Sequence, residues 1–514
     1  MLAVIITVTV LLVLYLYGTR NFKYWERRQV KHEKPVLFFG NNTRNYFMQK
    51  SVSEMAEELY WKYPSEKVVG FYRASRPELV IRDPEITKRI LTTDFANFYA
   101  RGLNKNTVEM EPLLRNLFFA DGDLWRLLRQ RMTSAFTSSK LKAMFPLIVE
   151  RAERLQMWAH NATSEGQEID ARELMARYTI DIIGACGFGL DSDSLKEENS
   201  TFQKLGNSIF KAGPKYFFII ILKELFPKIF NNLKVLTHVE KAIYRLVHDV
   251  LRQRNYEPST RNDFIDILLK YKKKGTIVGD SIEKIKPDGT PEIVSLEMND
   301  DLIAAQVFVF FAAGFETSSS ATSFTLHELA HHIDIQNKIQ QEIDSVLEKF
   351  DNKLCYDAIK EMRYLEWSFK EAMRIFPTGG YLMRKCSQKY TFEDLNLTID
   401  KGVGITIPIK SMQNDSKYFD NPSEFRPERF DPNNFNDNNK YIYLPFGGGP
   451  RACIGERFAL MQSIAGLVAI LSRFSVRPAP STVRHPEIEP TSAIVQTVKG
   501  GLPLLFLERK PREK

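Results

Sequence analysis

A single cysteine near the C-terminus lies in a setting that suits metal binding. Residues 446–455 read Phe-Gly-Gly-Gly-Pro-Arg-Ala-Cys-Ile-Gly, which places Cys453 in a glycine-rich loop two residues after Arg451. The apolar residues that follow, 456–474, predict a long helix. The positive field at a helix N-terminus favours thiolate, the form of cysteine that binds metal. Consecutive glycines let backbone approach a large flat ligand, and Arg451 would bind an anionic group on it; a structural turn with a buried thiol is the alternative.

A second candidate for chemistry follows an apolar run at residues 302–315, which we interpret as a buried core helix rather than a membrane span. The run changes abruptly to polar residues at Glu316 and Thr317. Gly314 in mid-helix costs about 1 kcal/mol relative to alanine, and a threonine hydroxyl can bond back to the carbonyl four residues earlier and open the helix. Such an opening over a metal leaves room for a small ligand and water. A simple polar end to an apolar face is the alternative.

Two further pairs of side chains stand at helical spacing. Trp125 and Arg129 are one turn apart, so both can donate to a single carboxylate from one helix face. A packed tryptophan beside a surface arginine is the alternative. Glu371 and Arg374 are three residues apart, where a surface ion pair would contribute little stability. Neither pair is diagnostic on its own.

In their order along the chain, these elements resemble the cytochrome P450 family. A Trp-x-x-x-Arg pair is followed by Ala-Gly-x-Glu-Thr at 313–317, Glu-x-x-Arg at 371–374, Pro-Glu-Arg-Phe at 427–430 and the cysteine loop. The resemblance spans essentially the whole chain. Segments such as 178–190 are similar to those of insect microsomal members that clear plant toxins and insecticides.

The resemblance implies roles for these residues. It implies haem b (iron protoporphyrin IX) with Cys453 as axial thiolate, which favours O–O cleavage. Thr317 would hydrogen-bond the bound dioxygen, and Glu316 would help to relay protons. The implied haem contacts are Trp125, Arg129, Arg384, Phe446, Gly449, Arg451 and Gly455. The implied structural network is Glu371, Arg374 and Arg429. The implied substrate pocket is Phe118, Phe119, Phe308, Phe311, Ala312, Ala313, Tyr381, Leu382 and Val495.

The implied reaction is monooxygenation, in which one atom of dioxygen enters a lipophilic substrate and the other leaves as water. Electrons would come from NADPH through a separate NADPH–cytochrome P450 reductase, because the chain shows no flavin or nicotinamide fingerprint, with cytochrome b5 as an optional second donor. Basic residues suggested for docking the reductase are Arg126, Arg131 and Arg457. Xenobiotics such as plant toxins or insecticides are the expected substrates, and a dedicated endogenous lipid or hormone hydroxylase is the alternative. A reductase-independent haem isomerase and a non-enzymatic haem protein are less favoured, because Glu316 and Thr317 are both present.

Residues 1–19 predict an N-terminal membrane anchor. The segment 2–17 is uncharged and apolar, and Arg20, Lys23, Arg27 and Arg28 follow it, which keeps that side cytosolic. A cleaved signal peptide is disfavoured because no basic residue precedes the run and no small-x-small cleavage site follows it. We therefore expect an anchor (1–19), a basic linker and hinge (20–40) and a haem domain (41–514) on the cytosolic face of the endoplasmic reticulum membrane.

By the resemblance, the fold class is mainly α with small β-sheets (α+β), a cytochrome P450 fold with a single large haem domain. A β-hairpin is predicted over residues 68–81 with its turn at Arg76-Pro77, and a solvated loop over 272–297. The apolar run 216–222 is either core or a segment that dips into the membrane.

Composition narrows the partners. The 514 residues carry a net charge of +8, and no arginine-rich tract or nucleic-acid motif is present, so an acidic partner or an anionic membrane surface fits better than nucleic acid. The four cysteines have no CxxC spacing, which disfavours a zinc site or a disulfide framework.

Overall fold

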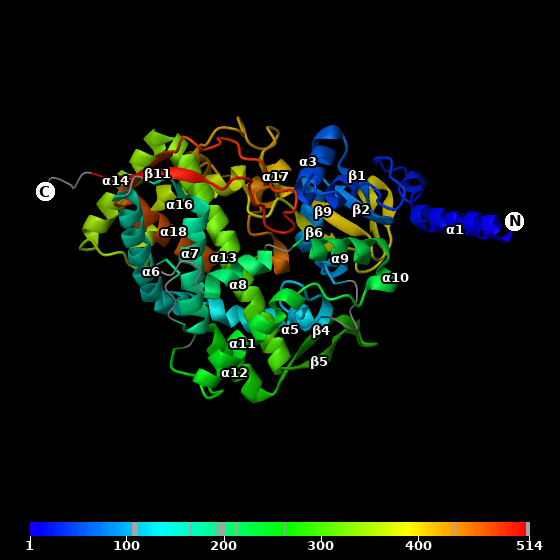
Figure 1. Cartoon of the computed structure of the whole chain (residues 1–514), viewed down its shortest axis with the longest axis horizontal. Helices are drawn as coiled ribbons and strands as arrows, with labels where there is room; N and C mark the ends of the chain where they lie inside the picture. Colours follow the sequence, from blue (N-terminus) through cyan, green and yellow to red (C-terminus); the bar gives the residue numbers. More distant parts are fainter. Residues whose placement is uncertain are drawn as a thin grey trace.

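Helices make up most of the chain and the sheets are small, so the predicted fold class is confirmed (Figure 1). The computed structural model describes residues 1–104, 111–164, 167–190, 194–195, 201–210, 213–261, 263–435 and 437–509; the last five residues of the predicted haem domain lie outside them. The α-helices are α1 (Leu2–Thr19), α2 (Thr43–Tyr46), α3 (Val52–Lys62), α4 (Pro84–Lys88), α5 (Gly122–Met132), α6 (Ser138–Ser164), α7 (Ala171–Ile182), α8 (Thr201–Phe210), α9 (Pro214–Leu225), α10 (Pro227–Phe230), α11 (Thr237–Gln253), α12 (Phe264–Lys274), α13 (Asp300–His331), α14 (Ile333–Lys349), α15 (Tyr356–Glu361), α16 (Arg363–Ile375), α17 (Ile409–Gln413) and α18 (Glu456–Leu471). The strands are β1 (Val68–Arg73), β2 (Arg76–Ile81), β3 (Ile169–Asp170), β4 (Thr276–Ile285), β5 (Pro291–Glu297), β6 (Leu382–Lys385), β7 (Tyr390–Phe392), β8 (Leu397–Ile399), β9 (Gly404–Ile407), β10 (Phe474–Pro478) and β11 (Pro503–Glu508).

The long helix α13 runs through the middle of the molecule (Figure 1). It begins at Asn299, whose side chain accepts a hydrogen bond from the Leu302 backbone N–H at 3.0 Å. Most of its side chains are buried, and they form one apolar core with side chains of α7, α16 and α18. The prediction that 302–315 is a buried core helix is therefore confirmed.

The largest sheet has the strand order β1-β2-β9-β6. β1 and β2 form the predicted hairpin, but the predicted turn at Arg76-Pro77 is wrong: Arg73 pairs with Arg76, so the turn is Ala74-Ser75. Ala74 takes the left-handed conformation that such a tight turn requires (φ 53°). Pro77 is tolerated because β2 pairs with β9 only from Glu78 onward.

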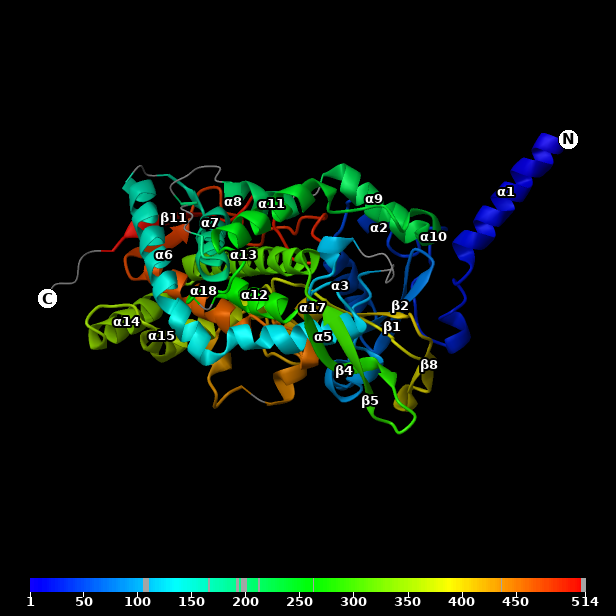
Figure 2. The same ribbon diagram turned by 90° about the horizontal axis from the view of Figure 1, so that it is seen from below.

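The loop predicted over 272–297 is also wrong. α12 extends to Lys274, and β4 and β5 then form an antiparallel hairpin that lies beside α5 (Figure 2). Ile277 pairs with Leu296 and Gly279 with Val294, and these positions face α5, while the alternate positions are exposed. The many charged residues of the outer face hid this two-residue alternation in the sequence.

The first helix, α1, projects away from the body, and its apolar side chains are exposed (Figures 1 and 2). α1 and α13 are the two helices of the described chain that are long and apolar enough to cross a membrane, and α13 is mostly buried. Where α1 meets the body, the Tyr17 hydroxyl donates to the Leu225 carbonyl at 3.0 Å, and its ring stacks on Phe226. The linker that follows is fixed to the sheet, because Trp25 is fully buried and donates to the Phe71 carbonyl at 3.0 Å.

Candidate functional site

Cys453 lies at the end of a tightly folded loop that leads into α18. The Cys453 backbone N–H donates to the Phe446 carbonyl at 2.8 Å, which closes the loop. Gly449 has a φ of +69°, and a Cβ there would stand 1.7 Å from the Leu91 carbonyl oxygen, so only glycine fits. Cys453 is exposed in this structure, so a ligand can reach its side chain.

The surroundings of Cys453 pull its pKa in two directions. Burial and the Glu456 carboxylate raise the pKa of the thiol, and the backbone N–H of Gly455 and the guanidinium groups of Arg129 and Arg101 offset only part of this, so the pKa is raised overall. Arg129 itself is held close by a hydrogen bond from its Nη1 to the Ala452 carbonyl at 2.9 Å. Because a metal ligand must be a thiolate, binding of a cation to the sulfur would release the thiol proton.

The buried Arg384 and Arg451 and the half-buried Arg101 form a cationic cluster next to this loop. Arg451 donates to the Tyr99 carbonyl at 2.6 Å and to Asp121 at 2.8 Å. Burial and the neighbouring arginines lower the pKa of Arg451 to about 8 and of Arg384 to about 9, and burial lowers that of Arg101 to about 10. Asp121 is the one carboxylate among the charges that act on these three groups. The cluster therefore carries more positive charge than its protein partners neutralise.

The cationic cluster fits an anionic ligand. Arg451 Nη1 and Arg384 Nε are buried and have no hydrogen-bond partner within the described chain. A buried guanidinium without its acceptors is costly unless a ligand supplies them. The two carboxylates of a haem would do so, beside a reachable thiol and a loop whose glycines admit a flat ring. The residues present therefore fit haem.

We expect opposite effects of Arg384→Gln on the ligand-free and the loaded protein. Loss of one cation relieves repulsion, so the ligand-free protein should resist urea better. Haem should leave the variant about 10- to 100-fold faster, since a hydrogen bond to a charged group contributes about 1.5–3 kcal/mol. Urea unfolding and haem transfer to apomyoglobin measure the two quantities.

Arg82→Gln is the matched control, because Arg82 is equally buried but donates to three carbonyls, those of Tyr60, Pro64 and Glu66. It should destabilise the ligand-free protein and leave haem release unchanged. Destabilisation of the ligand-free protein by Arg384→Gln would contradict the account of an uncompensated cluster.

A short stretch of α13 borders an internal space. Ala313 is exposed and Gly314 and Thr317 are half-buried, although most of the helix is buried. The Thr317 hydroxyl donates to the Ala313 carbonyl at 2.7 Å. The amide of Gln462 on α18 donates to the Gly314 carbonyl at 3.3 Å and to the Ser318 hydroxyl at 2.6 Å. These bonds fix this stretch of α13 to the helix that follows the cysteine loop.

Glu316 turns away from Thr317. Its side chain is buried and forms an ion pair with Arg172 at the start of α7, whose own side chain is 28% exposed. Asp170 fixes Arg172 by accepting from its backbone N–H at 3.0 Å. Glu316 therefore links the interior of α13 to a solvent-reaching side chain.

We expect Arg172→Ala to lower the free energy of unfolding by about 1–3 kcal/mol, since it strands a buried carboxylate. Glu316→Ala should recover part of this loss in the double variant, because the stranded charge is then gone. A double-mutant cycle by urea unfolding measures this coupling. Strictly additive effects would show that the pair is not energetically coupled.

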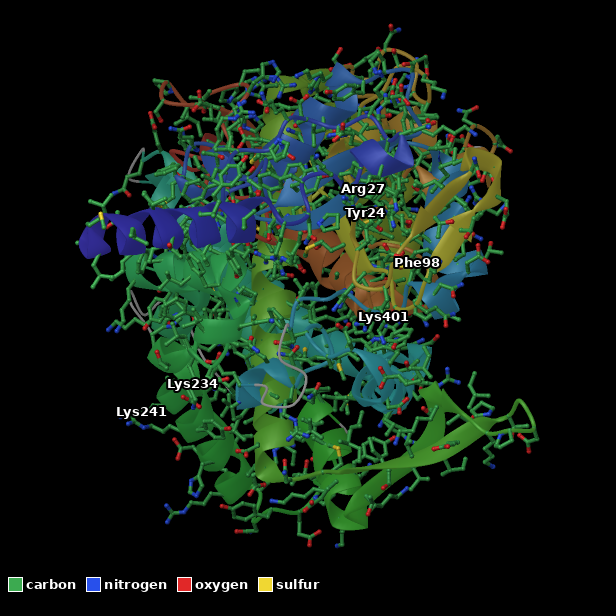
Figure 3. All side chains as sticks on the ribbon, turned by 90° about the vertical axis from the view of Figure 1, so that its right-hand side faces the viewer. Tyr24, Arg27, Phe98, Lys234, Lys241 and Lys401 are labelled. Atoms are coloured by element: carbon green, nitrogen blue, oxygen red, sulfur yellow. The ribbon has the colours of Figure 1, made fainter. Side chains whose placement is uncertain are left out.

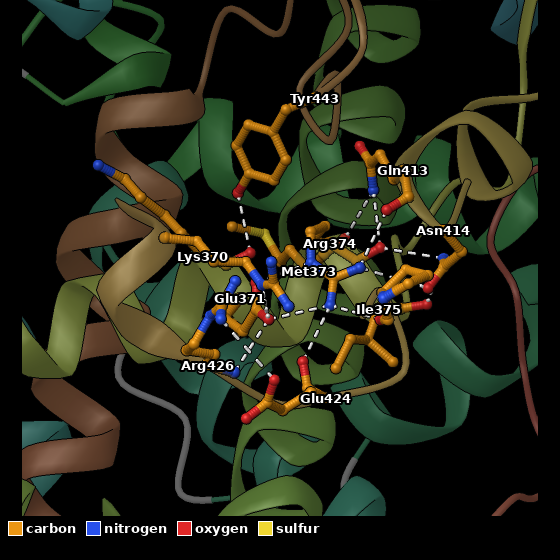
Figure 4. A network of polar contacts seen from close by, with 12 residues as sticks. Lys370, Glu371, Met373, Arg374, Ile375, Gln413, Asn414, Glu424, Arg426 and Tyr443 are labelled. Carbon is orange, nitrogen blue, oxygen red and sulfur yellow. Dashed lines mark hydrogen bonds and ion pairs between the residues drawn. The ribbon is translucent and has the colours of Figure 1, made fainter. Parts of the chain in front are cut away.

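Glu371, Arg374 and Arg429 form a buried network, and Figure 4 shows Glu371 and Arg374 within it. Glu371 accepts from Arg374 Nε at 2.8 Å and Nη2 at 2.9 Å, and from Arg429 Nε at 3.2 Å. Arg374 also donates to the Gln413 and Pro422 carbonyls. Gln413 in turn holds the Leu444 backbone N–H at 2.9 Å, just before the cysteine loop. The network thus connects α16 to the loop.

The predicted pocket residues fall into two groups. Those with accessible surface are Phe118, Phe119, Ala312, Ala313, Tyr381 and Leu382. Those that are buried are Phe308, Phe311 and Val495. Phe311 has no exposed surface and packs on Phe188 and Phe315, as a core side chain does. The residues of the first group are therefore accessible to a ligand, whereas Phe308, Phe311 and Val495 are buried.

Sequence reasoning missed Arg101, Asp121, Arg172 and Gln462. Asp121 precedes α5 and looks like a helix cap, yet its carboxylate accepts instead from the Arg101 and Gly102 backbone N–H groups and from Arg451. Arg101 and Arg172 belong to no local pattern, and only the fold brings them to the site.

The arginines carry positive charge that their protein partners do not neutralise, and the Cys453 thiol is accessible. A single ligand that carries two carboxylates and a metal ion would satisfy both, as haem does in a haem-thiolate protein. A family model described as Cytochrome P450 matches residues 30–504. The chain is 36% identical to cytochrome P450 6B7 of Helicoverpa armigera over 97% of this chain and 96% of that protein. It is 36% identical to cytochrome P450 6a2 of Drosophila melanogaster over 95% of this chain and 96% of that protein, and 35% identical to cytochrome P450 6B1 of Papilio polyxenes over 99% and 100%.

The chain therefore belongs to the cytochrome P450 family, which uses haem iron, and it is an oxidoreductase of the monooxygenase type.

Proposed function

We propose that the protein inserts one oxygen atom from dioxygen into lipophilic xenobiotics such as plant toxins or insecticides. The observation that carries this proposal is the buried cationic cluster beside Cys453, which provides a place for haem next to the opened stretch of α13. Full-length similarity to insect relatives supports the choice of substrate class.

In this proposal, each residue around the ligand has its own task. When bound, haem supplies oxygen activation, and a cysteine thiolate on its iron favours O–O cleavage. Cys453 is the thiolate; Arg101, Arg384 and Arg451 hold and neutralise carboxylates. Trp125 supports the cluster, since the guanidinium of Arg451 lies 4.3 Å from the centroid of its ring.

Proton delivery is assigned to α13. Thr317 holds a proton on Oγ1, which at present it donates to the Ala313 carbonyl, and it turns this donor toward the open space when a proton is needed there. Glu316 takes up protons from solvent water beside Arg172, whose guanidinium stays protonated throughout. The half-buried apolar residues Phe118, Phe119 and Leu382 orient an apolar substrate and exclude water.

Electrons are proposed to come from NADPH through a separate membrane-bound reductase, with cytochrome b5 as an optional second donor. Arg457 on α18 is exposed and lies four residues after Cys453, which suits contact with an acidic partner. Arg131 is only half-exposed and donates to the Val278 carbonyl of the hairpin, and Arg457 donates to the Ser138 hydroxyl.

The proposed location is the cytosolic face of the endoplasmic reticulum membrane. α1 supplies an anchor, and the run 216–222 in α9 contains no buried residue, which supports contact with the membrane rather than a place in the core. Phe218 is 59% exposed, and Ile229 on the adjoining α10 is 73% exposed. The exposed Lys234 and Lys241 lie on the side toward which α1 projects, where lysines favour anionic lipid (Figure 3).

The test uses the full chain in membranes with reductase, NADPH and ¹⁸O₂, and a panel of planar aromatic, terpenoid and fatty-acid compounds. We expect one ¹⁸O atom per product molecule, formed only when reductase and NADPH are both present. Labelled product from fatty acids alone would contradict the xenobiotic assignment. Absence of labelled product from every compound would contradict the proposed function.

A further inference from the structure

Hydrogen bonds and close packing attach the hairpin of β4 and β5 to the first turn of α5. The Asp123 carboxylate accepts from the Ser281 hydroxyl at 2.8 Å and from the Ile282 backbone N–H at 2.7 Å. The carboxylate of Glu283 lies over Gly122, where a Cβ would stand 2.5 Å from it. Gly122, with a φ of +59°, therefore leaves the space that Glu283 occupies. This end of the hairpin is built to fit the start of α5.

Glu283 also reaches a second segment. The Tyr99 hydroxyl donates to Glu283 Oε1 at 2.9 Å. Burial and this carboxylate raise the pKa of Tyr99 well above its usual range, so the phenol stays a donor at neutral pH. The hairpin thus holds both α5 and the Tyr99 segment, which are far apart from it in sequence.

The Tyr99 segment connects the three arginines of the cationic cluster. Its Tyr99 carbonyl accepts from Arg451 Nε at 2.6 Å. The next carbonyl, of Ala100, accepts from the Lys385 backbone N–H at 2.7 Å, next to Arg384 in β6. Arg101 follows directly, and its backbone N–H donates to Asp121 at 2.8 Å. A shift of this short segment would move all three guanidinium groups.

We propose that the hairpin braces the haem-carboxylate site, with Glu283 as a positioning residue that acts through Tyr99 on Arg101, Arg384 and Arg451. The inference rests on the proposed haem site. The hairpin makes no contact with the ligand itself in this proposal; it sets where the cations stand. An exposed strand pair between α12 and α13 thereby affects an interior site.

The test compares Tyr99→Phe, Glu283→Ala and the double variant of the full-length haem protein. Tyr99→Phe removes one oxygen atom and keeps the ring and the carbonyl that holds Arg451, so it should fold even where Glu283→Ala does not. We expect haem transfer to apomyoglobin to be about three- to tenfold faster in each variant, the size of one hydrogen bond. We also expect a lower midpoint potential of the haem, because a looser Arg451 stabilises the reduced form less. The double variant should match the single ones.

Tyr244→Phe is the control. The Tyr244 hydroxyl donates to Asp301 at 2.8 Å, a similar tyrosine–carboxylate pair outside the cationic cluster, and its loss should change neither quantity. If the wild type binds haem and Tyr99→Phe changes neither haem release nor midpoint potential, the positioning role of the hairpin is wrong and the proposed haem site stands. Additive effects in the double variant would also overturn the positioning role. A wild-type protein that binds no haem would overturn the proposed function and the inference with it.

Discussion

Thr317→Ala should lower the rate of product formation about 10²-fold or more, which is what one positioned proton donor contributes in general acid catalysis. The Thr317 hydroxyl is the polar side-chain group that lies beside Ala313 and Gly314 in the accessible part of α13. Its removal takes away the proton donor and leaves electron supply intact. NADPH consumption should therefore continue, with hydrogen peroxide replacing product, and both are measured in the reconstituted system.

The control for this prediction is Thr322→Ala in the same helix. Thr322 makes the same back-bond, from its hydroxyl to the Ser318 carbonyl at 2.7 Å, but it is fully buried away from the internal space. It should change product formation little. Equal losses in the two variants would show that Thr317 acts through helix geometry rather than as a proton donor.

Glu371→Gln should lower the free energy of unfolding by about 3–5 kcal/mol, the cost of removing one partner from a buried ion pair. Glu371 and Arg374 have no exposed side-chain surface, and Arg429 shares the same carboxylate. The amide keeps the shape but leaves the buried Arg374 without its counter-ion, while Arg429 keeps Asp420. Urea unfolding followed by circular dichroism measures the loss, and the yield of folded protein should fall with it.

A matched control exists on the same helix. Glu366 pairs with Lys370 at 2.6 Å, but both side chains are about a third exposed, so Glu366→Gln should cost no more than about 0.5 kcal/mol. Equal destabilisation by the two substitutions would show that the buried network of Glu371, Arg374 and Arg429 does not stabilise the fold as expected.

The sequence was sufficient to predict those parts of the site that are formed by residues close together in the chain. The cysteine loop, Glu316-Thr317 and the Glu371–Arg374 pair are local patterns in the sequence. In the cysteine loop the backbone conformation also restricts the residue type, as at the left-handed Gly449. The burial of most of residues 302–315 in α13 followed from the apolar composition of that run.

The sequence was insufficient where the fold joins distant segments. The cationic cluster assembles from three stretches of the chain, and its shared carboxylate, Asp121, stands at the N-cap position of α5 without capping it. The β4–β5 hairpin read as a loop because only one face of it is buried, and short strands with charged outer faces carry a weak signal. The turn of the first hairpin was displaced because Pro77 signals a turn but here begins a strand.

The measurement that tests the central claim most directly is the carbon-monoxide difference spectrum of the dithionite-reduced protein in membranes, with Cys453→Ala beside it. The account predicts a strongly red-shifted Soret band in the wild type, which reports a cysteine thiolate on haem iron, and its loss in the variant. A band typical of histidine-ligated haem in intact wild-type protein, or a red-shifted band that survives in Cys453→Ala, would contradict it.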